Sequence, residues 1–269
     1  MPRTHTPRLV LITGGTATSV YVLFIGLPLV ALLLRAAGAE GFLAALTGES
    51  ALTALRLSLF TSAISMAVVV LAGTPFAYLL ARSRLPGIRV LDTLVELPLV
   101  LPPVVAGLAM LMAFGRRGLL GRWLEPLGIV IPFTFVAVVF AQVFVAAPFY
   151  IRSARLGFEA VTVEYEELSQ TLGVSPIRTF WRVTLPLAWP SLLGGFALAW
   201  ARAISEFGAT IMFAGNFPGR TQTMPLAILS ALESDLSVAL AMAVLLAVVS
   251  VGILVALGVI RAAQGRPTP

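Results

Sequence analysis

The sequence predicts an all-α, polytopic membrane protein with about six transmembrane helices. Hydrophobic residues make up 59% of its 269 residues, charged residues only 11%, and the mean hydropathy is +0.99. Soluble globular domains do not have this composition. The apolar residues also gather in runs of about 20 or more, the length at which a helix crosses a bilayer core. Composition and run length together therefore set the fold class.

Six apolar runs have the length of a membrane-spanning helix. They cover residues 9–34, 52–80, 91–114, 133–158, 187–213 and 238–260. The first could instead be a signal peptide, because Arg3 and Arg8 precede it and Ala37-Gly38-Ala39 resembles a cleavage site. It exceeds the usual signal core of about 7 to 15 residues, so we expect a span. The predicted domains are an N-terminal tail (1–8), a transmembrane domain (9–260) that includes the loop 159–186, and a C-terminal tail (261–269).

Arginine placement predicts the orientation. The net charge of +6 arises from 18 arginines against 12 acidic residues, because the chain contains no lysine. Six spans put both chain ends and the 159–186 loop on one side, where eleven arginines fall against five opposite. Under the positive-inside rule this side is cytoplasmic, although the outer cluster of three arginines is an exception. The loop-side arginines are Arg3, Arg8, Arg82, Arg84, Arg89, Arg152, Arg155, Arg178, Arg182, Arg261 and Arg266, and the opposite ones are Arg35, Arg116, Arg117, Arg122 and Arg220.

Several kinds of chemistry are excluded by residue type. The chain has no cysteine, which excludes disulfides, thiolate metal sites and cysteine nucleophiles. Its one histidine, His5, lies in the polar N-terminal tail. The Gly-x-x-x-x-Gly-Lys-Ser/Thr phosphate loop is also missing, so the chain cannot carry nucleotide chemistry itself. We expect no metal and no bound cofactor.

The longest polar segment between spans, residues 162–186, predicts two short helices. Thr162 can cap a first helix whose early turns hold Glu164, Glu166 and Glu167, where carboxylates offset the helix dipole. Gly173 should end it. This helix also carries an apolar stripe of Tyr165, Leu168 and Leu172.

The second helix should begin at Ser175-Pro176 and end at Pro186, since proline suits a first helical turn and interrupts a helix interior. A bent helix pair between spans suits a protrusion that docks into a partner. A surface loop that happens to be helical is the alternative.

Three prolines interrupt the third run. Pro98, Pro102 and Pro103 remove backbone donors, and such breaks persist at membrane depth where the freed carbonyls face protein or water. The run is a candidate pore lining, and a packed proline kink is the alternative.

The fifth run contains Arg202, Ser205, Glu206 and Thr210. A charged residue at mid-membrane costs roughly 2.5 to 3.5 kcal/mol on insertion scales, so these side chains should face the bundle interior. Arg202 and Glu206, four residues apart, can form a structural pair. They can also line an anion path.

The turn at 214–223 combines Asn216, Arg220, Thr221, Gln222 and Thr223 without a carboxylate. These donors could meet an oxyanion or the rim of a binding protein. An ordinary hydrophilic turn has the same composition.

Two stretches resemble known proteins. Glu167-Leu168-Ser169, Gly173 and Val183-x-Leu185-Pro186 resemble the cytoplasmic signature loop of bacterial ABC importer permeases, with Leu and Ser in place of two alanines. Residues 206–228 closely resemble the molybdate ABC transporter permease family, and Leu97–Pro103 and Phe114–Gly118 are similar to it in the same order. The likeness covers about residues 51–260. Sulfate and tungstate permeases share much of the pattern.

The resemblance implies the ABC type I importer permease fold and a pore for ATP-driven uptake of a tetrahedral oxyanion, molybdate first. It also implies a second copy of the chain, an extracytoplasmic binding protein, and separate ATPase subunits that hold ATP and Mg. The chain would sit in the inner membrane with both termini cytoplasmic, contacting lipid and no nucleic acid. The residues expected at the ATPase are Glu166, Glu167, Leu168, Ser169, Gly173, Leu185 and Pro186.

Two other classes were weighed. An ion-coupled secondary carrier would use the buried Glu206 as a proton site and would work without an ATPase. An intramembrane enzyme has less support, because no His or Cys cluster and no facing carboxylate pair is present.

Overall fold

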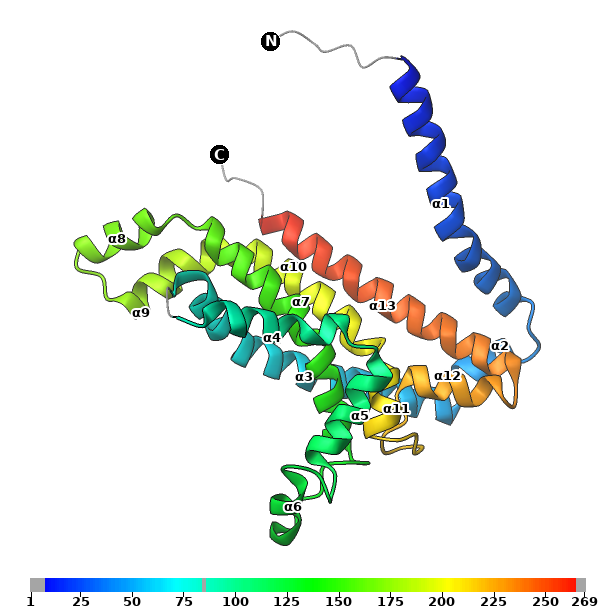
Figure 1. Cartoon of the computed structure of the whole chain (residues 1–269). Helices are drawn as coiled ribbons and strands as arrows, with labels where there is room; N and C mark the ends of the chain where they lie inside the picture. Colours follow the sequence, from blue (N-terminus) through cyan, green and yellow to red (C-terminus); the bar gives the residue numbers. More distant parts are fainter. Residues whose placement is uncertain (1–7, 84–85, 265–269) are drawn as a thin grey trace.

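The computed structural model describes residues 8–83 and 86–264, and within these ranges it contains helices and no strand. Three long helices form its centre (Figure 1). They are α3 (Glu49–Arg82), α7 (Phe135–Ala160) and α10 (Leu185–Ile204). The tail predictions for 1–7 and 265–269 lie outside the described residues. The predicted all-α class is confirmed.

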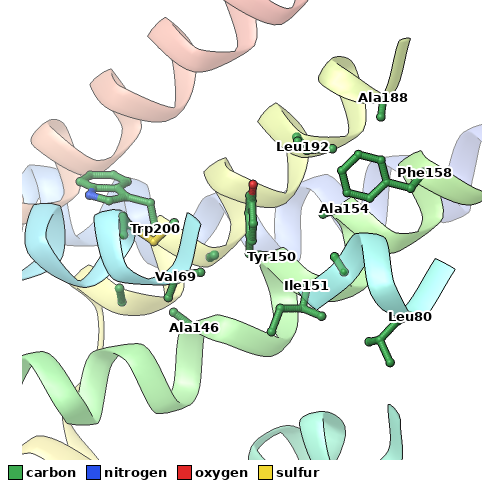
Figure 2. Packing of buried hydrophobic residues seen from close by; sticks show 14 of the residues in the cluster. Val69, Leu80, Ala146, Tyr150, Ile151, Ala154, Phe158, Ala188, Leu192 and Trp200 are labelled. Atoms are coloured by element: carbon green, nitrogen blue, oxygen red, sulfur yellow. The ribbon is translucent and has the colours of Figure 1, made fainter. Parts of the chain in front are cut away.

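The main core lies where α3, α7 and α10 meet (Figure 2). Tyr150 and Phe158 from α7 are almost fully buried there, together with Trp200 from α10 and Leu80 from α3. Tyr150 keeps its polar end satisfied through a hydrogen bond between its Oη and Thr74 Oγ1 at 2.6 Å. An aromatic core that includes an internal polar contact thus helps to hold the three helices together.

Small residues bring α7 and α10 into close contact. A Cβ on Gly157 would lie 2.5 Å from Ser191 Cβ, and one on Gly195 would lie 2.6 Å from Ser153 Cβ. Ser153 Oγ also donates a hydrogen bond to Ser191 O at 2.8 Å. Close backbone approach at glycine and serine is the usual way in which helices associate in lipid.

Four predicted spans are confirmed as continuous helices: 9–34 within α1 (Arg8–Ala37), 52–80 within α3, 133–158 largely within α7, and 238–260 within α13 (Leu236–Gln264). α1 lies apart from the other helices (Figure 1), and its most apolar stretch is not buried by the chain. Near its end Ala36 is buried, and α1 contacts α13.

The predicted interruption of the 91–114 run by its prolines is confirmed, and the break is sharper than a proline kink. α4 (Ile88–Val100) and α5 (Pro103–Phe114) are bent by 118° at Leu101-Pro102. Both residues between them are extended, because the residue before a proline is driven out of the helical region and prolines lack the N–H that would continue the ladder. Pro98 is accommodated inside α4.

The prediction of one helix over 187–213, by contrast, is wrong. α10 ends at Ile204, and the short α11 (Gly208–Phe213) begins after a break. The Glu206 carboxylate stabilises this break, since its Oε1 accepts the Ala209 N–H at 2.7 Å at the start of α11. A capping carboxylate inside an apolar run therefore starts a new helix.

The remaining helices are short. α2 (Phe42–Leu46) precedes α3, α6 (Gly121–Leu124) with the 3₁₀ turn Glu125–Leu127 follows α5, and α12 (Met224–Leu232) precedes α13. In Figure 1 the pair α8 (Val163–Thr171) and α9 (Pro176–Thr179) projects at one end of the long helices. α6 projects elsewhere, beyond the start of α7.

Candidate functional site

The α8–α9 knob, residues 162–186, confirms the predicted pair of short helices. Gly173 separates them with a φ of +83°, a left-handed conformation that favours glycine. Its N–H donates to Gln170 O at 2.9 Å, and Val174 N–H donates to Ser169 O at 3.1 Å, which closes the C-terminus of α8. Ser169 Oγ and Thr179 Oγ1, 3.0 Å apart, then join α8 to α9.

Two details of the knob differ from expectation. Thr162 and Ser175 occupy the N-cap positions without a side-chain capping hydrogen bond. Pro186 does not end the second helix, because α9 continues through a π-helical turn, η2 (Phe180–Thr184), directly into α10. A π turn just before a proline changes the bonding pattern, so the missing Pro186 N–H need not break the helix.

Glu166 anchors the knob to the transmembrane helices. Its side chain is buried, and its Oε1 accepts hydrogen bonds from Arg82 Nη2 at 2.8 Å and from Thr184 Oγ1 at 2.8 Å. Tyr78 Oη donates to Oε2 at 3.3 Å. Arg82 Nη2 also donates to Val161 O at 2.8 Å. The network joins the end of α3, the end of α7, α8 and η2.

Among the residues predicted to couple the chain to an ATPase, Glu166 has its carboxylate turned inward and used within the chain. Sequence reasoning missed Arg82, Tyr78 and Thr184. Arg82 and Glu166 are 84 positions apart, so no local spacing could have paired them.

The outer face of the knob is apolar and exposed. Tyr165, Leu168, Leu172 and Ile177 are 55%, 60%, 76% and 75% exposed. The predicted stripe of 165, 168 and 172 is therefore present but is not covered by this chain. Glu167 and Pro186 are also exposed, and Ser169 and Leu185 are half-buried. A contiguous exposed apolar surface with charges beside it is typical of a site for another protein.

The two broken helices meet each other. A Cβ on Gly208 of α11 would lie 2.8 Å from Pro103 Cβ at the start of α5, and a Cβ on Gly107 would lie 2.7 Å from Ala209 O. Pro98 is half-buried, whereas Pro102 and Pro103 are exposed on the surface of the single chain. The structure thus brings Pro103 next to the break at Glu206.

At that break Arg202 Nη2 lies 2.6 Å from Glu206 Oε2, an ionic contact whose angle is not that of a hydrogen bond. Glu206 is 1% exposed, Thr210 is fully buried and Ser205 is exposed. The geometry matches the structural pair that the sequence left open, with capping of α11 as an added role. Thr210 Oγ1 has no hydrogen-bond partner within the described ranges.

The loop after α11 folds most of its polar groups inward. Asn216 Nδ2 and Gln222 Nε2 donate to Ser230 Oγ at 2.9 and 3.3 Å. Thr221 Oγ1 accepts the Phe217 N–H at 3.1 Å, and Thr221 and Thr223 are buried. Arg220 is exposed instead, and it lines a cavity that also contains Arg116.

Comparison with known proteins matches this architecture. Residues 73–266 match the family described as "Binding-protein-dependent transport system inner membrane component". The chain is 45% identical over 258 residues to "Molybdenum transport system permease protein ModB" of Mycobacterium tuberculosis, covering 96% of this chain and 95% of that protein. It is 36% identical to "Sulfate transport system permease protein CysW" of Synechococcus elongatus, covering 85% of this chain and 80% of that one.

A solved structure has the same fold at low identity. It is a bacterial ABC transporter involved in the import of alginate, with a TM-score of 0.77, 16% identity and coverage of 96% of each chain. The family match covers most of the chain, and the relatives are similar over nearly its whole length. The chain therefore belongs to the family of binding-protein-dependent transport system inner membrane components.

Proposed function

We propose that this chain is the membrane-spanning permease subunit of an ABC importer that takes up a tetrahedral oxyanion, with molybdate as its main cargo. The observation that carries the proposal is the 45% identity, over 96% of the chain, to a protein named as a molybdenum permease. Identity to the sulfate permease is lower, at 36% over 85% of the chain. Sulfate, thiosulfate or tungstate is the second choice of cargo.

Energy would come from separate ATPase subunits that bind ATP and Mg, since the chain has no phosphate loop. The exposed apolar face of the α8–α9 knob is the surface that would contact them. Its anchor supports this role. Arg82 in α3 and Thr184, directly before α10, both donate hydrogen bonds of 2.8 Å to Glu166. A movement of the knob would therefore be transmitted to α3 and α10.

The conduit would form between two copies of the chain. α1 is apolar and uncovered by its own chain, and α4 and α5 expose large apolar residues such as Leu94, Val100 and Met112. Such surfaces suit lipid or a second copy. ATP-driven closure of the ATPase subunits would then tilt the helices attached to the knobs, so that the conduit opens first to one side of the membrane and then to the other.

The knob and both chain ends would be cytoplasmic in the inner membrane, as the arginine distribution favours. An extracytoplasmic binding protein would dock on the opposite side. There α5, α6 and the loop after α11 are the available surfaces.

The test is co-purification of the chain with an ATPase and a binding protein encoded beside it, followed by reconstitution into vesicles. We expect ATP-dependent uptake that is faster for molybdate than for sulfate. Uptake driven by a proton gradient without an ATPase would favour the secondary carrier. Against that alternative, both oxygens of Glu206 already lie against partners within the chain, Arg202 and the Ala209 N–H.

A further inference from the structure

A cavity of about 670 Å³ lies at the beginning of α7, at the opposite end of this helix from the knob. α7 has 26 residues, so the two sites are separated by about 39 Å along its axis. Three segments line the cavity. They are the end of α5 (Leu111, Gly115, Arg116), the approach to α7 (Phe133, Thr134) and the loop after α11 (Arg220).

The cavity is positively charged. Arg116 and Arg220 are among its lining residues, and no lining residue is acidic. The neighbouring carboxylate of Glu125 lies 3.9 Å from Arg116 Nε, with the two side chains 51% and 70% exposed. An exposed ion pair of this kind is weak, so it does not hold Arg116 away from an anionic ligand.

Arg116 lies in a tight turn whose backbone conformation is fixed by a hydrogen bond and by close packing at a glycine. Gly118 N–H donates to Gly115 O at 2.7 Å, and a Cβ on Gly121 would lie 1.7 Å from the same oxygen. Only glycine fits there. The turn therefore fixes the backbone position of Arg116 beside the cavity.

Arg220 is held by a second tight turn. Phe217 O accepts the N–H groups of Arg220, Thr221 and Gln222 at 3.1, 2.9 and 3.0 Å, and Gly219 has a φ of +71°. This turn packs against the approach to α7, since the Phe217 and Phe133 rings meet nearly edge to face at 6.3 Å. Both arginines thus project from rigid backbone.

Between them the backbone is strained. Phe133 is the one described non-glycine residue with a positive φ, 61°, and its N–H donates to Phe213 O at 3.1 Å. A bulky residue rarely adopts this conformation, and such strain gathers at functional sites. Thr134 follows as the N-cap of α7, so the positive end of that helix dipole also faces this region.

We propose that this cavity is an anion vestibule in which Arg116 and Arg220 bind a tetrahedral oxyanion before it enters the conduit. The identity of the anion rests on the proposed function. Guanidinium groups suit oxyanions because their N–H groups can donate in pairs to two oxygens. The volume leaves room for hydrating water, so binding is weak and sensitive to salt, and its effect is to concentrate the anion locally.

The vestibule also accounts for arginines on the side where the positive-inside rule expects few. Arg116 and Arg220 line the cavity, whereas Arg122 does not and instead stacks on Trp123 at 5.3 Å. Arg122 therefore provides a matched control within the same outer segment.

The test is residue-resolved modification of arginines by phenylglyoxal, read by mass spectrometry on the purified transporter complex without binding protein. We expect millimolar molybdate to slow modification of Arg116 and Arg220 several-fold relative to chloride of equal ionic strength. Arg122 should be unaffected. Equal slowing at all three arginines, no slowing at any, or slowing only after the binding protein is added would overturn the proposal.

Uptake by variants gives a second, independent measurement. The double variant Arg116→Gln/Arg220→Gln should take up molybdate several-fold more slowly than Arg122→Gln at low salt, and the difference should shrink at high salt. A difference independent of salt would count against an electrostatic vestibule. Protection of Arg116 and Arg220 by molybdate without any ATP-driven oxyanion uptake would refute the proposed function but support the anion site. ATP-driven uptake without such protection would support the proposed function but refute the anion site.

Discussion

Replacing Glu166 by glutamine should release the α8–α9 knob from the transmembrane helices. The change is isosteric, but it removes the charge that Arg82 Nη2 and Nε contact at 2.8 and 3.2 Å. Breaking a fully buried ion pair by removing one partner costs about 3 to 5 kcal/mol. The Arg82 side chain is 16% exposed and can regain some water, so we expect a smaller loss of stability than this range, about 2 to 3 kcal/mol.

The assay is paired. Thermal unfolding of the complex in lipid nanodiscs measures the loss of stability, and reconstituted vesicles measure ATP hydrolysed per molybdate taken up. We expect a lower unfolding temperature and more ATP hydrolysed per molybdate taken up. Glu167→Gln is the matched stability control, because Glu167 lies one position further along the same helix but is exposed. Its unfolding temperature should change little.

A double variant separates charge from packing. Arg82→Met/Glu166→Met removes both partners, and replacing a buried ion pair by apolar residues is often neutral or stabilising. It should recover much of the stability that Glu166→Gln loses. If Glu166→Gln has normal stability and normal coupling, the buried pair is not the link between the knob and α3, and the reasoning is refuted.

Three further predictions follow from single positions. Gly173→Val places a β-branched residue at a φ of +83°, which should lower the stability of the folded knob by about 1 to 2 kcal/mol or more. It should also weaken coupling between ATP hydrolysis and uptake, and unchanged coupling in vesicles would contradict the role of this break. Gly195→Ala should lower the unfolding temperature by an amount equivalent to about 1 to 3 kcal/mol, since its Cβ would meet another helix at 2.6 Å, whereas Gly252→Ala in α13 meets nothing within 4 Å and should be neutral or stabilising. In Glu206→Gln the amide oxygen can still accept the Ala209 N–H, so ATP-driven uptake should persist. If uptake by the unmodified chain depends on a proton gradient and the variant loses uptake, a secondary carrier is supported instead.

The two broken spans depend on contacts that the local sequence does not reveal. Pro102 and Pro103 mark a break, yet nothing local reveals whether a proline pair kinks a helix slightly or turns it by 118°. That angle depends on the contact of α5 with α11, where Gly208 and Pro103 touch. Glu206 was read as a charge inside a helix, and it proves to be the residue that starts the next one.

The knob shows the same division. Its two helices and the Gly173 break followed from capping, proline and glycine rules, which act over a few residues. The inward turn of Glu166 did not, because its partners Arg82 and Tyr78 belong to another helix. Glu166 and Glu167 are adjacent in sequence and read alike, yet one is buried and the other exposed.

Length and apolarity of the runs, arginine placement and turn residues were enough to determine an all-α membrane protein, its approximate spans and its protruding knob. These properties follow from the cost of unsatisfied backbone and charge in lipid, which each segment meets on its own. The tertiary structure alone decided which charges meet, how far the broken helices bend, and that Arg116 and Arg220 share one cavity. Those outcomes depend on contacts between residues distant in the chain, and no local periodicity encodes them.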